Sequence, residues 1–273
     1  MLLSAGAPTT VPTSAAATST SIPTAGLIVD LDADKGVKLE DGDRVAAWEN
    51  QVHFAADVFK ATRRDGRPTL RRAVPELDAH PAIVFEKQEL LNNSEDAFDD
   101  LIRGTGYTWC AVIAPHKQVG TLQDVNSFFG NLKNGGNYEG FWAGFNDDNT
   151  LWMGSRNGVT FGRWNSDNPK VLGPKLEVRR FYVVAGRMGA GTGTVQVELF
   201  VDDCKHVSAE PFPVNPKADS SKMAIGQERD ATNHPGKESF KGEIGRILFW
   251  DRPLSDDELA ATISAMTQEY GIR

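Results

Sequence analysis

Aromatic rings and planar polar side chains gather between residues 137 and 168. This stretch reads NYEGFWAGFNDDNTLWMGSRNGVTFGRWNSDN, so aromatic residues are interleaved with asparagine, aspartate and arginine. Aromatic faces pack on the C–H surfaces of sugars, and planar polar side chains bond their hydroxyls. We therefore expect ligand contacts from the following four residues: Trp152, Arg156, Arg163 and Trp164.

The same aromatic residues also have a structural interpretation, because alternate residues of a strand point into the core of a β-protein. A core position is the expectation for Phe141, Phe145 and Phe161. Trp152 and Trp164 have arginine and asparagine close by, so for them both interpretations stay open.

The segment FNDDNT at 145–150 is expected to form a hairpin turn, because asparagine and aspartate favour turns. A calcium loop is the alternative, since hard oxygen ligands gather there. The five histidines are scattered along the chain without the spacing of a metal site. We therefore assign no metal ligands and expect no cofactor, apart from the calcium alternative.

The segment KATRRDGRPTLRR at 60–72 reverses the sign of charge in an otherwise acidic chain. Arginine forks match sulfate and carboxylate groups, so one interpretation is contact with an anionic polysaccharide. The preferred interpretation is a solvated loop whose arginines pair with acidic residues elsewhere.

Composition excludes several classes of function. The chain of 273 residues has 29 basic and 37 acidic residues and a net charge of −8, which argues against nonspecific nucleic-acid binding. No stretch approaches 18 apolar residues, so no membrane span is expected. Cys110 and Cys204 form neither a zinc signature nor a disulfide framework, and we expect free thiols.

Residues 1–25 differ from the rest of the chain. They carry no charge and are rich in serine, threonine, alanine and proline, which favours extended or disordered backbone. We expect a tail or linker with few contacts to the body, and an extracellular or cell-surface location. Residues 26–273 are expected to form one domain.

From residue 26 onward, β-branched and aromatic segments are separated by Gly, Asn, Asp and Pro. Many short strands without interleaved helices indicate an all-β protein built as a two-sheet antiparallel sandwich. The expected strands are 27–33, 44–50, 82–86, 107–115, 127–132, 140–146, 150–156, 159–164, 180–188, 194–203, 222–228 and 243–251.

A single helix is expected over 256–270. Ser255 and Glu258 have the spacing of a capping box, and Leu254 and Leu259 that of a hydrophobic staple. Gly271 supplies a C-terminal stop. The apolar stripe that should face the body consists of Leu259, Ile263, Met266 and Tyr270.

Several motifs together resemble one family. They are GLIVDLDADKGVKLEDGDRVAAWENQ (26–51), GRPTL (66–70), HPAIVFE (80–86), VELFVDDCKHVSA (197–209), AIGQERD (224–230) and FKGEIGRILFWDRPLSDDEL (240–259). This pattern is similar to the laminin-G-like, concanavalin A-like jelly-roll domains of bacterial extracellular proteins. The resemblance implies a β-sandwich whose final strand is followed by a capped helix at one end or edge of the sheets.

Two positions depart from the family pattern. Asp203 stands where the turn usually has glycine, so a non-glycine residue with positive φ or another turn type is expected. Arg246 stands where an acidic residue is common in the final strand, which weakens any carboxylate role there.

The family resemblance includes enzymes as well as lectins. The E-x-D-x-x-E strand of laminarinase-like hydrolases is absent, and Arg179, Arg180 and Tyr182 lack the Q-x-H partner that a lyase would need. The dense acidic run SEDAFDD at 94–100 looks like a loop or helix start. We therefore assign no catalytic residues. The acids to test first in an enzyme would be Glu139, Asp147, Asp148 and Asp167.

The sequence thus predicts a noncatalytic, lectin-like module that binds a polysaccharide or glycan. A polysaccharide-degrading enzyme, either a glycoside hydrolase or a polysaccharide lyase, is the alternative. Paired carboxylates in a cleft would favour the enzyme, and an aromatic face without shifted acids would favour the binder.

Overall fold

The computed structural model describes residues 21–118, 126–133, 136–160, 165–229 and 238–273. Three predicted residues, Phe161, Arg163 and Trp164, lie outside this described part.

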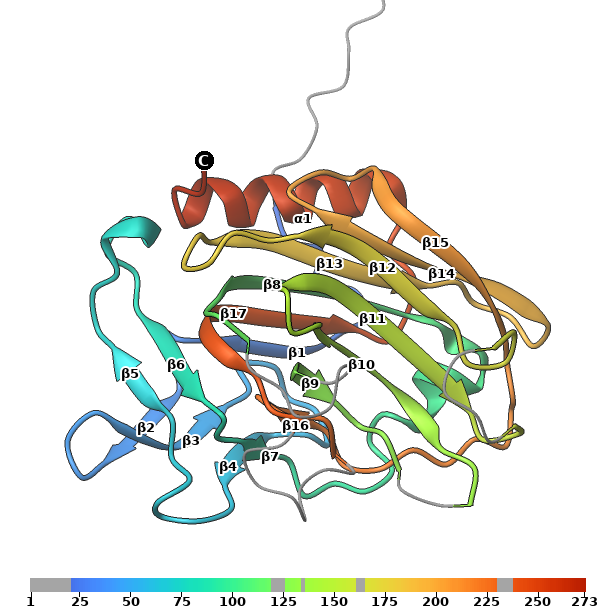
Figure 1. Ribbon diagram of the computed structural model, residues 1–273, viewed down its shortest axis with the longest axis horizontal. Coiled ribbons are helices and arrows are strands. Elements are labelled where there is room, and N and C mark those ends of the chain that lie inside the picture. The colour runs from blue at the N-terminus through green and yellow to red at the C-terminus, as the bar shows by residue number, and fades with distance from the viewer. Residues whose placement is uncertain (1–20, 119–125, 134–135, 161–164, 230–237) are drawn as a thin grey trace, which may run out of the picture.

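The described chain is made mainly of antiparallel strands (Figure 1). The first eight strands are β1 (Leu27–Asp32), β2 (Val37–Glu40), β3 (Arg44–Glu49), β4 (Val58–Ala61), β5 (Thr69–Arg71), β6 (Ala82–Glu86), β7 (Leu90–Leu91) and β8 (Tyr107–Pro115). The others are β9 (Asn126–Gly130), β10 (Glu139–Phe145), β11 (Thr150–Asn157), β12 (Lys170–Lys175), β13 (Tyr182–Met188), β14 (Thr194–Val201), β15 (His206–Pro213), β16 (Ala224–Ile225) and β17 (Lys241–Trp250). The short turns η1 (Pro75–Leu77) and η2 (Leu101–Thr105) and the helix α1 (Asp256–Glu269) complete the elements.

Hydrogen bonds join the strands of the described residues into one seventeen-stranded network. One arm runs β4–β7–β16–β9–β10–β11–β12, and the other runs β17–β8–β13–β14–β15. Strand β12 lies against β14 and β15, so the network is nearly closed. The expected all-β fold is confirmed. The expected division into two sheets is met only in part, because the strands form one barrel-like network.

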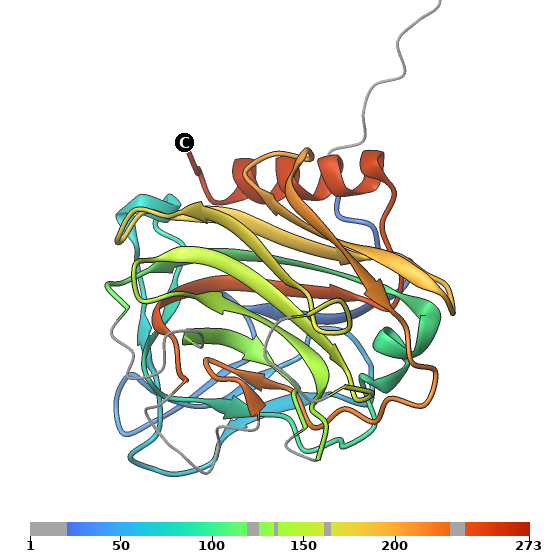
Figure 2. The same cartoon turned by 45° about the vertical axis from the view of Figure 1, so that its right-hand side comes forward.

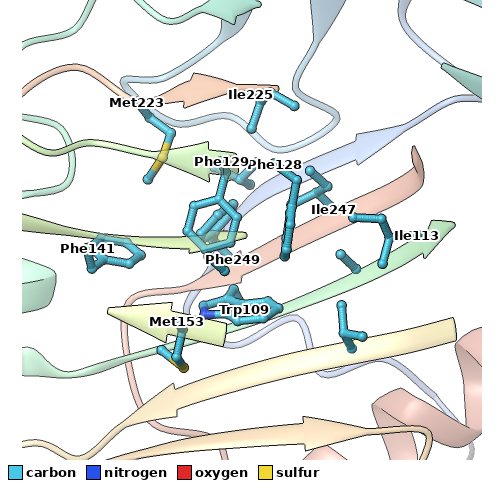
Figure 3. Packing of buried hydrophobic residues seen from close by; sticks show 14 of the residues in the cluster. Trp109, Ile113, Phe128, Phe129, Phe141, Met153, Met223, Ile225, Ile247 and Phe249 are labelled. Carbon is cyan, nitrogen blue, oxygen red and sulfur yellow. The ribbon is translucent and has the colours of Figure 1, made fainter. Parts of the chain in front are cut away.

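The main core fills the space between the two arms (Figure 3). Its centre is a group of perpendicular aromatic rings, in which Trp109 packs edge-on against Phe128 and Phe129, with ring centroids 5.7 and 5.2 Å apart. Phe129 meets Phe249 of β17 in the same way at 5.0 Å. Phe141 also belongs to this core, as the sequence predicted.

A second apolar cluster lies on the other face of β8 and β13, under α1. Figures 1 and 2 show the position of this helix beside the sheet. All four stripe residues are buried there, which confirms the expected docking of the helix: Leu259, Ile263, Met266 and Tyr270. The helix therefore covers the face of these strands, where the family resemblance had implied an end or edge. It begins with the predicted capping box, since Glu258 N donates to Ser255 Oγ (3.3 Å) and Ser255 N donates to Glu258 Oε2 (2.9 Å).

Replacing Ser255 with alanine is expected to lower the free energy of unfolding by about 1 kcal/mol, because the first turn loses its capping acceptor. Urea unfolding followed by circular dichroism measures the change. The matched control is Ser264→Ala in the body of the same helix, where no cap is lost and a much smaller change is expected. Equal losses in both variants would show that the cap contributes nothing.

The end of the N-terminal segment is bound to the body, which corrects part of the expectation for residues 1–25. Ile22 packs against the cluster under α1. The indole of Trp250 donates to the carbonyl of Pro23 at 2.8 Å, and Arg252 Nε donates to the carbonyl of Ala25 at 3.0 Å. The body therefore extends to about residue 22 on the N-terminal side.

The turn between β14 and β15 resolves the first departure from the family pattern. Asp202, and not Asp203, has a positive φ of 52°. Its carboxylate accepts from Val183 N at 2.8 Å, and its own N–H donates to Val183 O. Two hydrogen bonds to the neighbouring strand β13 thus support the left-handed conformation of Asp202, which aspartate tolerates better than most residues.

Candidate functional site

The candidate site lies on the face of β10 and β11 that is turned away from the main core. Alternation along β10 places Phe141, Ala143 and Phe145 in the core, so Trp142 points to the opposite face. There Trp142 and Trp152 form a separate small cluster with Leu132 and Tyr138. We call this surface, with its charged neighbours Arg156 and Lys170, the outer face.

Glycines make room for the tryptophan pair. Across the strands, Trp142 stands opposite Gly130 on one side and Gly154 on the other. A Cβ at Gly154 would lie 2.6 Å from Trp142 Cζ2, so the ring rests directly on the neighbouring backbone. The rings of Trp142 and Trp152 are perpendicular (89°), with centroids 5.6 Å apart. The outer face is therefore a fitted aromatic layer.

Two cations lie over these rings. The guanidinium of Arg156 is 5.0 Å from the ring centre of Tyr138 and 5.9 Å from that of Trp142. The ammonium of Lys170 is 4.3 Å from the ring centre of Trp152. Cation–π attraction of this kind is worth about 0.5–2 kcal/mol, depending on desolvation. The outer face thus combines aromatic rings with planar and point-like donors.

The structure corrects the expected role of Trp152. Its side chain is fully buried, between Trp142 and the ammonium of Lys170, so in this conformation it offers no surface for a sugar. Arg156, 8% exposed, lies at the edge of the same cluster. Arg163 and Trp164 lie outside the described residues.

Sequence reasoning missed Trp142, Tyr138 and Lys170. The sequence did contain a signal for Trp142. If Phe141 and Phe145 point into the core, strand alternation turns the side chain of Trp142 to the opposite face. Lys170 carried no such signal, since its place over Trp152 depends on the pairing of β11 with β12.

The four acids proposed for an enzyme are engaged in local structure. Glu139 Oε2 accepts a hydrogen bond from Asp219 N at 2.8 Å. Asp148 Oδ1 accepts from Thr150 N at 3.0 Å, and this hydrogen bond lowers the pKa of Asp148. Asp147 Oδ1 lies 3.4 Å from the amide nitrogen of Asn126, and Asp167 accepts a hydrogen bond from the hydroxyl of Thr160. They do not converge on one point.

A different acidic group lies at the end of the molecule near η2. Carboxylate oxygens of Asp96, Asp99 and Asp219 lie within 4.8 Å of one another. Burial raises the pKa of Asp99, whose Oδ2 is 2.9 Å from Arg103 Nη2. Asp219 is paired with Lys133. Two cations therefore neutralise much of this charge.

The arginines of 60–72 pair with acidic residues, as the preferred interpretation predicted. Arg67 contacts Glu40 and Asp41, and Arg64 makes a two-pronged contact with Asp41. The remaining pairs are Arg63 with Asp65, Arg71 with Glu76 and Glu243, and Arg72 with Asp43.

The segment 145–150 forms the hairpin turn between β10 and β11. Asn146 N donates to Thr150 O at 2.9 Å, and Asn149 adopts a left-handed φ of 69°. Both cysteines are free thiols, Cys110 in the core under α1 and Cys204 in the β14–β15 turn. None of the helices in the described residues is long and apolar enough to cross a bilayer.

A family model described as the concanavalin A-like lectin/glucanases superfamily matches residues 92–260. No curated protein matches the chain. Among solved structures, Trypanosoma rangeli sialidase in complex with sialic acid aligns at 13% identity and a TM-score of 0.56, over 91% of this chain and 34% of the sialidase chain. Ruminococcus gnavus IT-sialidase CBM40 bound to α2,3-sialyllactose aligns at 17% identity and a TM-score of 0.46, over 67% of this chain and 95% of that one. The chain therefore spans about a third of the sialidase that it matches.

Proposed function

The chain belongs to the concanavalin A-like lectin/glucanases superfamily, and from this premise we propose that it is a noncatalytic, lectin-like jelly-roll module that binds glycans. The observation that carries the proposal is the outer face, where a tryptophan pair supports Tyr138, Arg156 and Lys170. Tyr138 and Lys170 are half-buried, so part of each side chain reaches the surface, and Lys170 Nζ also donates to Asn146 Oδ1 at 2.9 Å.

In this proposal the buried tryptophans support the site and the groups above them contact the sugar. Tyr138 offers an aromatic face, Arg156 a planar set of donors, and Lys170 an ammonium. The predicted contacts from Arg163 and Trp164 remain part of the proposal. The sialidase that shares the fold is described with bound sialic acid, which supports a sugar as the partner here. The composition of residues 1–25 supports an extracellular or cell-surface location.

Replacing Arg156 with lysine, or Trp164 with alanine, is expected to weaken glycan binding by about tenfold while the fold survives, because planar and aromatic contacts carry much of the energy of such sites. A glycan array with the purified protein identifies the ligand, and titration calorimetry with that glycan gives the dissociation constants.

The control for this prediction is Arg72→Ala, since Arg72 is an exposed arginine paired with Asp43 away from the outer face. Its affinity should equal that of the parent protein. Unchanged affinity in both Arg156→Lys and Trp164→Ala would refute this site. An array without any bound glycan would refute the function.

The alternative is a polysaccharide-degrading enzyme, and one observation favours it. Asp99 has a raised pKa and lies within 4.8 Å of two other carboxylates, close to the separation of about 5 Å used by retaining glycosidases. Incubation with the array-positive polysaccharide, followed by an assay for new reducing ends or unsaturated products, tests it. Products that disappear in Asp99→Asn would establish the enzyme and overturn the binding-only proposal.

A further inference from the structure

A cavity of about 480 Å³ lies at the end of the molecule where the chain leaves α1. Three segments that are distant in sequence surround it: the η1 turn, the β12–β13 loop, and residues 271–273. Figure 1 shows the backbone of these segments on the same side of the molecule. Its apolar surface includes Phe181 and Ile272. The volume is within the range of small-molecule sites, which is roughly 300–1,000 Å³.

Two of the charged residues around this cavity are already paired. Arg180 contacts Glu177 at 3.0 Å and the carbonyl of Arg273 at 3.3 Å. Glu76 contacts Arg71 at 3.2 Å. Arg180 and Glu76 therefore form part of the wall and have little capacity left for a ligand.

Arg179 and Asp78 are uncommitted in the described part of the chain, as is the guanidinium of Arg273. Within the described residues, neither the guanidinium of Arg179 nor the carboxylate of Asp78 has an ion pair or a side-chain hydrogen bond. Arg179 comes from the β12–β13 loop and Asp78 from the η1 turn, so a cation and an anion line the same cavity from different segments.

The backbone at both residues is held in a costly conformation. Asp78 has a φ of 49° and Arg179 a φ of 64°, in the left-handed region that side chains such as arginine rarely adopt. The position of Arg179 is fixed by its N–H, which donates to Pro115 O at 2.7 Å. Non-glycine residues in this region cost about 1–3 kcal/mol each and cluster at ligand clamps. The backbone positions from which these two side chains start are thus fixed.

We propose that this cavity binds a small polyhydroxylated carboxylic acid, of which a hexuronate is the test case. The ligand carboxylate pairs with the Arg179 fork, and its hydroxyls donate to Asp78. The C–H face of the ligand lies on Phe181 and Ile272. The proposal does not depend on the glycan site of the outer face, which involves none of these residues.

Titration of the whole protein with D-glucuronate, followed by ligand-observed NMR and calorimetry, tests the proposal. We expect saturable binding with a dissociation constant on the order of 1 mM. Arg179→Gly should weaken it by about tenfold or more. Glycine accepts the φ of 64° without strain, so this variant removes the guanidinium and keeps the fold.

The variant Asp78→Asn tests the contact between the ligand hydroxyls and Asp78 separately from the contact with Arg179. Asparagine also tolerates the left-handed region, so the turn should persist while the acceptor for hydroxyls is weakened. We expect a loss of about threefold to tenfold for glucuronate and no change for acetate. The control is Arg72→Ala, because Arg72 is exposed, is paired with Asp43, and precedes η1 in the sequence. This variant should bind glucuronate as tightly as the parent protein does.

Three results would overturn the proposal. The first is the absence of saturable binding by glucuronate, and the second is equal affinity of Arg179→Gly and the parent. The third is equal binding of glucuronate and either acetate or neutral D-glucose, because a simple anion site or an unspecific sugar surface would then explain the data. None of these results bears on the outer face, which is tested with Arg156 and Trp164.

Discussion

Replacing Arg246 with alanine is expected to lower the free energy of unfolding by about 3–5 kcal/mol, because it leaves a mostly buried carboxylate without its partner. Arg246 is 8% exposed. Its Nε and Nη2 each donate to the carboxylate of Asp30 at 2.8 Å, and Nη1 donates to Glu269 at 2.9 Å. One side chain therefore ties β1, β17 and α1 together.

The charge on Arg246 is stable in this setting. Burial by itself lowers the pKa of the guanidinium, but the hydrogen bonds and charge of Asp30 outweigh it and raise the pKa above its ordinary value. Urea unfolding near neutral pH, followed by circular dichroism, measures the loss in the variant.

Two further variants separate the ion pair from side-chain packing. Arg72→Ala removes an exposed pair with Asp43 and should cost no more than about 1 kcal/mol. The double variant Asp30→Leu, Arg246→Met replaces the whole pair by apolar groups and should recover much of the lost stability. If Arg246→Ala were as stable as the parent, the buried pair would have no structural role.

The sequence identified Arg246 as a departure from the family pattern but gave no partner for it. Asp30 lies 216 residues away, and the two meet because β1 pairs with β17 in a register that sets Asp32 opposite Arg246. Local sequence patterns do not determine such a register, since it follows from the packing of the whole sheet.

Features with local signals were predicted well. The helix began and ended close to the predicted residues because its cap, its apolar stripe and Gly271 all act within a few positions. Buried strands such as β8 and β17 were recognised from their apolar runs. The strands β2, β4, β5, β7, β12 and β15 were absent from the expected set, because they are short or largely exposed and carry polar residues.

The closure of the sheet and the packing around Trp142 depend on pairing between strands that are distant in sequence, so local patterns did not predict them. The strands 127–132, 140–146 and 150–156 were predicted nearly in place, but nothing in them showed that Gly130 and Gly154 would flank the ring of Trp142. The sequence showed that residues 137–168 are rich in aromatic side chains. It did not show that Trp152 would be buried, because that depends on the same non-local pairing.

The second large effect is expected at this tryptophan. Replacing Trp152 with alanine should lower the free energy of unfolding by about 3–5 kcal/mol, because a fully buried ring is removed and leaves a cavity beside Trp142. Lys170 would also lose the ring beneath its ammonium. Urea unfolding gives the loss of stability, and calorimetry at low temperature gives the glycan affinity of the folded fraction.

The combination of the two measurements decides what Trp152 does. A supporting residue should change stability strongly and affinity by less than about threefold, whereas a contact residue should do the reverse. Arg156→Lys should give the opposite pattern on the same face, with clearly weaker binding and a loss of stability no larger than its cation–π contacts, about 0.5–2 kcal/mol. Trp152→Phe retains an apolar ring of smaller size and should therefore fall between the parent and Trp152→Ala in stability. A stable Trp152→Ala variant with lost glycan binding would contradict the buried role, and would mean that the ring turns outward when the ligand binds.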